Sequence, residues 1–130
     1  MKELVLLPGP AAFSIYPLFT SEAPIHSFLG AVTATIEAHD SACSNGISVE
    51  EYVYQFPKNM QVLAVPRNLH FKHDILSYVA TYQLKGNTLT VKRTLDDRSP
   101  GPICTQAISI EYQKMATIIS KNTRAQVVYR

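Results

Sequence analysis

The chain has 130 residues, of which 46% are hydrophobic and 17% charged, and its formal net charge is +2. This length suits one domain with a single core, and the apolar fraction is too high for an intrinsically disordered chain. Lysine and arginine form no run, so the composition gives no sign of a nucleic-acid-binding surface. No stretch approaches the roughly 20 consecutive apolar residues of a membrane span. The opening sequence MKELVLLPGP also lacks the features of a signal peptide.

The first thirty residues contain four of the eight prolines and yet remain apolar. Because proline has no N–H to donate to a central strand, this part should be extended and rich in loops. We expect residues 1–30 to form a proline-rich arm that packs on a β-sandwich domain covering residues 31–130. The apolar side chains predicted to form a docking patch on this arm are Phe13, Ile15, Tyr16 and Phe19.

Alternation of apolar and polar residues predicts a series of strands. Residues 31–38 alternate strictly, and HDSACSNG at 39–46 has the composition of a loop. Three more extended segments follow, bounded by proline and turn residues. They are ISVEEYVYQF at 47–56, MQVLAVP at 60–66 and the short NLHFKHD at 68–74.

Residues 78–95, YVATYQLKGNTLTVKRTL, predict a β-hairpin about Gly86-Asn87, with Gly86 at the first central position of a type II′ turn. A slip of one residue would turn the apolar set to water, so the register should be strongly fixed. Arg93 falls on the apolar face opposite Ala80, and we expect it to reach the rim or to pair with a carboxylate. The apolar pairs are Leu84 with Leu89, Tyr82 with Val91, and Tyr78 with Leu95.

After the loop DDRSPGP the apolar period becomes helical, which predicts an amphipathic helix over about 107–121 and then a strand, AQVVY. Glu111 near the start and Lys121 near the end suit the helix dipole. The element order predicts a mainly β fold: an antiparallel β-sandwich, immunoglobulin-like or related, with one C-terminal amphipathic helix. The apolar stripe of the helix is Ile108, Tyr112, Met115, Ile118 and Ile119.

Two cysteines are too few for a disulfide framework or a zinc site. Cys43 and Cys104 fit either one disulfide in an exported protein or two free thiols. A thiol enzyme would need Cys104, just before the helix, to be exposed with a histidine in hydrogen-bond reach. His70 and His73 lie three residues apart, which on a strand places them on opposite faces and disfavours a metal pair. We expect no catalytic residue, metal or cofactor.

The seven tyrosines raise the alternative of a carbohydrate-binding surface, because aromatic faces stack on sugars. Tyr52 and Tyr54 alternate with Val53, and Tyr78 and Tyr82 fall on the apolar face of the hairpin. This pattern favours cross-strand packing in the core over an exposed aromatic platform.

Residues 52–95 resemble the C-terminal β domain of unknown function of bacterial transglutaminase-like proteins. The features that carry the resemblance are the strand with Tyr54, Phe56 and Pro57, the VLAVPRNL strand and turn, Ser77-Tyr78, the Gly86-Asn87 turn, the TVKRTL return strand, and a tyrosine-bearing C-terminal helix. In that family a papain-like catalytic core lies upstream of this domain. The loops DDRSPGPICTQAIS and HDSACSNG depart from the family pattern.

The resemblance implies a non-catalytic accessory domain of a protein that is periplasmic or otherwise exported. Its partner would be the transglutaminase-like catalytic core, in the same chain or in another protein. The alternative is a stand-alone module that binds a carbohydrate or protein ligand. The placement of the aromatic side chains distinguishes these interpretations. Aromatic side chains that fill the core favour the accessory domain, and aromatic side chains that line an exposed face favour the ligand-binding module.

Overall fold

The structure is a computed structural model that describes residues 10–15, 25, 41–42, 46–100 and 103–130. Its described strands and helix are, in chain order, β1 (Ala11–Ser14), β2 (Ser41–Ala42), β3 (Gly46–Gln55), β4 (Val62–Ala64), β5 (Leu69–His73), β6 (Leu76–Lys85), β7 (Thr88–Asp97), β8 (Ile103–Cys104), α2 (Gln106–Thr123) and β9 (Gln126–Tyr129). The predicted fold class is confirmed: the chain is mainly β, with antiparallel sheets and one C-terminal helix.

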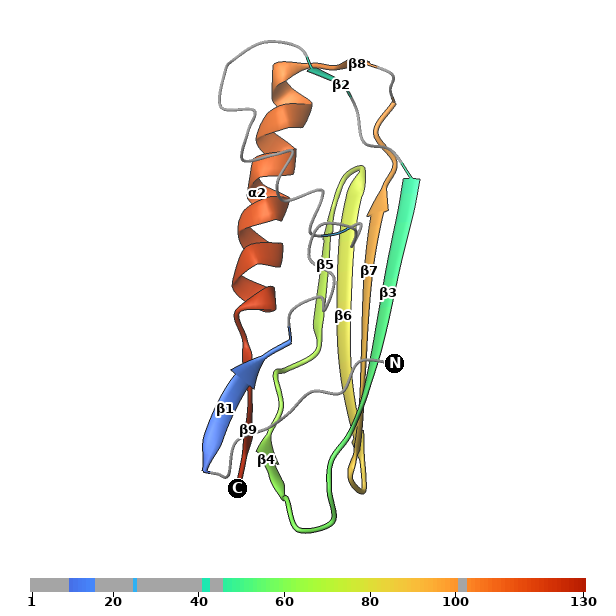
Figure 1. The fold of residues 1–130 in the computed structure, drawn as a ribbon. Helices are drawn as coiled ribbons and strands as arrows, with labels where there is room; N and C mark the ends of the chain where they lie inside the picture. Colours follow the sequence, from blue (N-terminus) through green and yellow to red (C-terminus); the bar gives the residue numbers. More distant parts are fainter. Residues whose placement is uncertain (1–9, 16–24, 26–40, 43–45, 101–102) are drawn as a thin grey trace.

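The described elements form two layers (Figure 1). One layer is a four-stranded sheet in the order β3-β7-β6-β5. The other layer consists of α2 and, beyond its C-terminal end, the three-stranded sheet β1-β9-β4. A third pairing, of β2 with β8, lies near the N-terminal end of α2. Apolar side chains from both layers meet between them, so the sheet presents one face to the core and the other to solvent.

The hairpin of β6 and β7 has the register predicted from the sequence. Its pairs include Leu84 with Leu89, Tyr82 with Val91 and Tyr78 with Leu95. Gly86 has a φ of 58°, whereas Asn87 is not among the residues with positive φ, as a type II′ turn requires. Tyr78, Leu89 and Val91 are fully buried. Short sequence separation and glycine chemistry together specify this hairpin.

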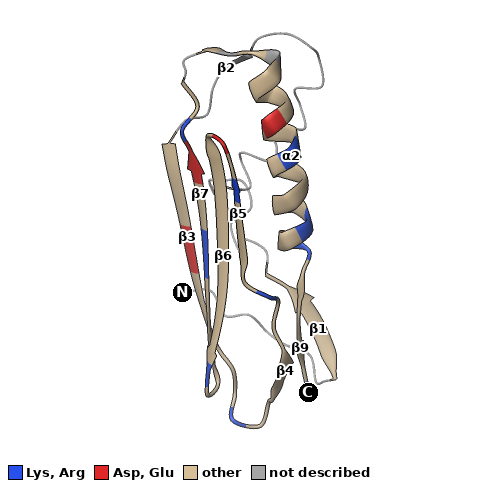
Figure 2. Cartoon of the chain, turned by 180° about the vertical axis from the view of Figure 1, so that it is seen from behind, with Lys and Arg blue, Asp and Glu red and all other residues tan. Residues whose placement is uncertain are grey.

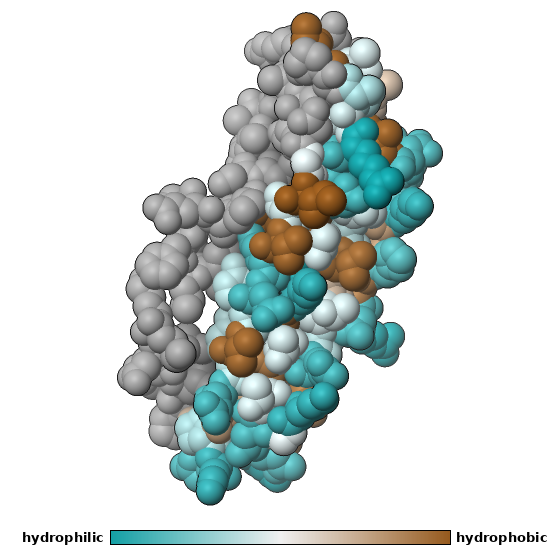
Figure 3. All heavy atoms as spheres, turned by 90° about the vertical axis from the view of Figure 1, so that its right-hand side faces the viewer, coloured by the Kyte–Doolittle hydropathy of each residue, from teal (hydrophilic) through white to brown (hydrophobic). Residues whose placement is uncertain are grey.

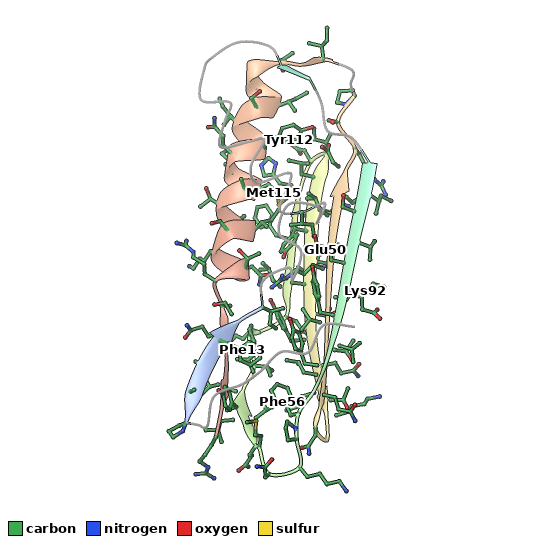
Figure 4. All side chains as sticks on the ribbon, in the orientation of Figure 1. Phe13, Glu50, Phe56, Lys92, Tyr112 and Met115 are labelled. Carbon is green, nitrogen blue, oxygen red and sulfur yellow. The ribbon has the colours of Figure 1, made fainter. Side chains whose placement is uncertain are left out.

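Helix α2 covers the upper part of the sheet with the predicted apolar stripe. Tyr112, Met115 and Ile119 are buried and point into the space between the layers, as Figure 4 shows for Tyr112 and Met115. The helix begins at Gln106 and ends at Thr123, slightly beyond the predicted 107–121. The first turn contains no acidic residue, so Glu111 lies beyond the turn in which the helix dipole stabilises a carboxylate, and that part of the prediction is wrong. Lys121 lies in the last turn, as predicted.

The described part of the predicted arm is built into a sheet. Strand β1 pairs antiparallel with the C-terminal strand β9, and β9 pairs on its other side with β4. In the segment predicted as a loop, residues 41–42 form the short strand β2. The strand predicted at 31–38 lies outside the described residues.

Candidate functional site

A buried polar cluster lies between the four-stranded sheet and the second layer. Its centre is Arg93 on β7, whose side chain is 1% exposed. Glu50 on β3 is the cross-strand partner of Arg93 and is 7% exposed. Residues directly opposite each other in an antiparallel pair have Cβ atoms about 4.5–5.5 Å apart. In Figure 2 the acidic segment of β3 lies beside the basic segment of β7. The prediction that Arg93 reaches the rim is therefore wrong. Its cross-strand neighbour is the carboxylate of Glu50.

Glu50 makes its hydrogen bonds with groups other than Arg93. Its Oε1 accepts from the backbone N–H of Ile25 at 3.1 Å, and its Oε2 accepts from the hydroxyl of Tyr52 at 3.1 Å. Ile25 is 1% exposed, so the first of these bonds is in the interior. Glu50 thus holds the backbone of Ile25, which is distant in the sequence, against the inner face of β3.

The side chain of Arg93, in contrast, has no hydrogen-bond partner among the described residues. Its Nε, Nη1 and Nη2 atoms are all buried, and none has a hydrogen-bond partner there. A guanidinium carries five N–H donors and stays charged at all accessible pH values. Burying it without hydrogen bonds is costly, and the nearby Glu50 charge offsets only the electrostatic part of that cost.

Two buried tyrosines tie the sheet to the helix. The hydroxyls of Tyr78 and Tyr82, both on β6, donate to Oδ1 of Asn122 on α2 at 2.8 and 3.2 Å. All three side chains are buried. A single amide oxygen therefore accepts two interior hydrogen bonds that would otherwise leave phenols unpaired.

The surroundings of the cluster shift the tyrosine pKa values. Burial, followed by the charge of Glu50 and the hydrogen bond to it, raises the pKa of Tyr52 to about 12. Burial also raises the pKa of Tyr54 and of Tyr78. The positive charge of Arg93 acts in the opposite direction on all three pKa values, so its field reaches each of these phenols.

A second group of polar side chains joins the helix to the end of β7. The Tyr112 hydroxyl lies 2.7 Å from Oδ2 of Asp97 and 2.8 Å from Oγ of Ser99. Asp97 Oδ1 also accepts from the backbone N–H of Ser99 at 2.9 Å. Because the phenol has one proton, it donates to the carboxylate and can accept from the serine hydroxyl. These hydrogen bonds satisfy the buried carboxylate of Asp97 and connect α2 to the end of β7.

His73, at the end of β5, lies next to this group. Its Nδ1 is 2.7 Å from Oε2 of Glu111 and 3.6 Å from Oδ2 of Asp74. The Glu111 contact is short but is not aligned as a hydrogen bond. Asp74 has a φ of 43° in the turn between β5 and β6, which brings its carboxylate to the same side. The three groups link this turn to α2.

The outer face of β3 is exposed and carries three apolar side chains besides Glu51 and Gln55. Ile47, Val49 and Val53 are 67%, 52% and 60% exposed, whereas Glu50 on the inner face of the same strand is buried. Figure 4 shows Glu50 on the helix side of the sheet and Lys92, from β7, on the opposite side. From the β3 side, brown apolar atoms appear at intervals among polar ones (Figure 3). We call Ile47, Val49 and Val53 the β3 strip.

Of the residues predicted to form a docking patch, the two that the structure describes pack on the core. Ile15 is 1% exposed, and Phe13 packs on the core, with ring centroids 5.9 Å from Tyr54 and 6.1 Å from Tyr129. These two residues are therefore not an exposed patch, because β1 is a strand whose apolar side chains face the core. Tyr16 and Phe19 lie outside the described residues.

The cysteine predictions stay predictions. Cys104 is in β8, where its backbone pairs with Ser41 of β2. The side chain of Cys104 and the whole of Cys43 lie outside what the structure describes. The disulfide and the thiol-enzyme interpretation therefore remain hypotheses.

The described tyrosines fill the interior instead of lining a surface. Four of them are buried, and Tyr52 and Tyr54 are half-buried on the inner face of β3. His70 and His73 fall on opposite sides of β5, as predicted. Within the described ranges, no three His, Cys, Asp or Glu side chains gather closely enough to hold a metal ion. None of the described helices is long and apolar enough to span a membrane.

A family model matches part of the chain. Residues 45–97 match a family described as a domain of unknown function with a solved structure, DUF3858. This segment runs from the start of β3 to the end of β7, so it contains the whole four-stranded sheet and both Glu50 and Arg93. No curated protein and no solved structure matches the chain.

Sequence reasoning missed the buried cluster because its members come from distant segments. The hairpin register did place Arg93 on the inner face, which was the available signal. The pairing of β3 with β7 could not be read from local patterns, so Glu50 was not recognised as the neighbour of Arg93. The contacts of Asn122 with Tyr78 and Tyr82 likewise depend on how the helix packs.

Proposed function

We propose that the chain is a non-catalytic interaction module that packs through the β3 strip on another protein domain. The observation that carries this proposal is the exposure of three apolar side chains on the outer face of β3. This face bears Ile47, Val49 and Val53 together with the exposed Glu51, while Glu50 is turned inward. A solvent-facing side of an antiparallel sheet is ordinarily polar. A long strand at the edge of the described sheet with exposed apolar side chains is a liability unless something covers it.

The finer proposal is that the covering domain is a transglutaminase-like catalytic core, and that the protein is exported. It is supported by the resemblance of residues 52–95 to the C-terminal domain of such proteins. The match of residues 45–97 to a domain of unknown function is compatible with this and supplies no activity of its own. Contacts between domains of one chain commonly bury about 600–1,500 Å². The β3 strip would form part of such a contact.

The alternative, a carbohydrate-binding module, is less well supported. An aromatic sugar platform requires exposed rings, and the described tyrosines are buried or half-buried on inner faces. Their hydroxyls also take part in interior hydrogen bonds, as at Tyr78 and Tyr82.

The mass of the native protein tests this proposal. An antibody raised against the chain is used in an immunoblot of the source cells. A band several times larger than the 14.5 kDa of the present chain supports an accessory module attached to a catalytic core. A band at 14.5 kDa contradicts attachment to a core in the same polypeptide. In that case, failure to recover a larger protein after cross-linking would contradict docking as well.

A further inference from the structure

We propose that the outer edge of β3 binds an extended segment of the partner domain as an added antiparallel strand. This inference rests on the proposed docking function and specifies how the partner contacts the β3 strip. In the described sheet β3 is the outermost strand, and its 10 residues all pair with β7. The other edge of β3 therefore has no strand beside it among the described residues (Figures 1 and 2).

The backbone groups at this edge belong to the residues of the β3 strip. The N–H of Phe56 donates to the carbonyl of Asn87 at 2.8 Å and continues the register of the β3–β7 pair. Antiparallel ladders alternate between residue pairs that exchange hydrogen bonds and pairs whose N–H and C=O groups point away from each other. Even-numbered residues of β3 therefore bond to β7. The N–H and C=O groups of Ile47, Val49 and Val53 point instead to the open edge.

The exposure of the side chains agrees with an open edge. Val49 and Val53 are more than half exposed, whereas their neighbours on β7, Thr94 and Thr90, are half-buried on the same face. A side chain with a strand on each side is covered by two neighbours, and a side chain at an edge by one. A strand added to β3 would cover the strip and bond its outward N–H and C=O groups at the same time. A domain resting on the face alone would leave those groups to water.

The charges on β3 disfavour a second copy of this chain as the added strand. The two antiparallel registers that overlap β3 most fully with its own copy place either Glu50 or Glu51 opposite the same residue of that copy. Like charges directly opposite each other across two strands are destabilising. The segment that fits comes from a different sequence. It has apolar residues opposite Val49 and Val53 and no acidic residue opposite Glu51.

Amide hydrogen exchange of the chain, resolved by residue with NMR, tests whether the edge is open. We expect the amides of Val49, Glu51 and Val53 to exchange about a hundredfold faster than those of the even-numbered residues of β3, which bond to β7. Equal protection of the two sets would show that the edge is already paired and would overturn the proposal. In the protein isolated with its partner, the odd-numbered amides should become protected. A partner that covers the strip and leaves these amides unprotected would contradict strand addition while supporting docking.

A synthetic peptide serves as the probe for the partner segment. It alternates threonine with valine and has one lysine at its centre, so that valines can lie opposite Val49 and Val53 and the lysine opposite Glu51. At millimolar concentration we expect the peptide to slow exchange of the three odd-numbered amides by about tenfold, because they gain hydrogen-bond acceptors. No slowing at these amides would overturn the proposal.

Two N-methylated forms of the peptide are matched controls for each other. Methylation of the two valine amides on either side of the lysine removes donors that face β3, and we expect it to weaken binding about tenfold. Methylation of the two threonine amides next to the lysine affects N–H groups that point away from β3, so we expect a change of less than about threefold. Equal weakening by the two modifications would show that the peptide does not pair with the edge and would overturn the proposal.

Discussion

Glu50 lies on β3 directly opposite Arg93 on β7, and both side chains are buried. Glu50→Gln keeps an oxygen for the Ile25 amide but removes the charge that offsets Arg93. Neutralising Glu50 leaves the buried charge of Arg93 uncompensated, and an uncompensated buried charge typically costs roughly 3–5 kcal/mol of unfolding free energy. We expect a loss of this size in urea denaturation. The exposed neighbour Glu51 is the control, and Glu51→Gln should change stability by less than about 0.5 kcal/mol. Equal effects at the two positions would contradict the account.

Tyr52 gives the molecule a stability limit at alkaline pH. Its folded-state pKa is about 12, against an ordinary value of 10, because of burial and the nearby Glu50. The folded state therefore retains the phenol proton more strongly than the unfolded state does. The associated stability is fully present below pH 10 and is lost as the pH rises from about 10 to 12. We expect Tyr52→Phe to reduce this loss, as measured by urea denaturation at several pH values. An unchanged pH profile would show that Tyr52 is not responsible.

Between elements, Asn122 is the main polar link from α2 to β6, through Tyr78 and Tyr82. Asn122→Ala leaves both buried hydroxyls without their acceptor, which we expect to cost roughly 2–3 kcal/mol of unfolding free energy. Gln113→Ala, at an exposed position of the same helix, should be close to neutral. Chemical denaturation followed by circular dichroism measures both. A neutral effect of Asn122→Ala would mean that the helix does not depend on this link.

Among the elements, those fixed by local patterns could be predicted from the sequence, and those fixed by long-range pairing could not. The register of the β6–β7 hairpin was predictable to the residue, since Gly86 fixes the turn and the apolar alternation fixes the pairing. The stripe of α2 was predictable because its period is local. Two pairings were not: β3 with β7, and β1 with β9 at opposite ends of the chain. Long-range pairing depends on the whole core, so Arg93 could be placed on a face while its neighbour Glu50 remained unidentified.

For the whole molecule, the central claim is that the β3 strip is covered in the native protein. The strip lies on the outer face of β3 beside Glu51. Turning the strand over would bury Glu51 and expose the rings of Tyr52 and Tyr54, so the exposure of the strip cannot be relieved in this way. An apolar strip with this constraint is suited to an interface.

Carbene footprinting of the protein isolated from its source cells tests this claim most directly. Photolysis labels exposed side chains, and mass spectrometry compares the β3 peptide with the peptide containing Ile110 of α2. In the isolated chain Val49 and Val53 are 52% and 60% exposed and Ile110 is 46% exposed, so β3 should label at least as strongly. The account predicts that in the native protein β3 labels several-fold less than Ile110. Equal or stronger labelling of β3 would show that the strip is open to solvent and would contradict the interaction module.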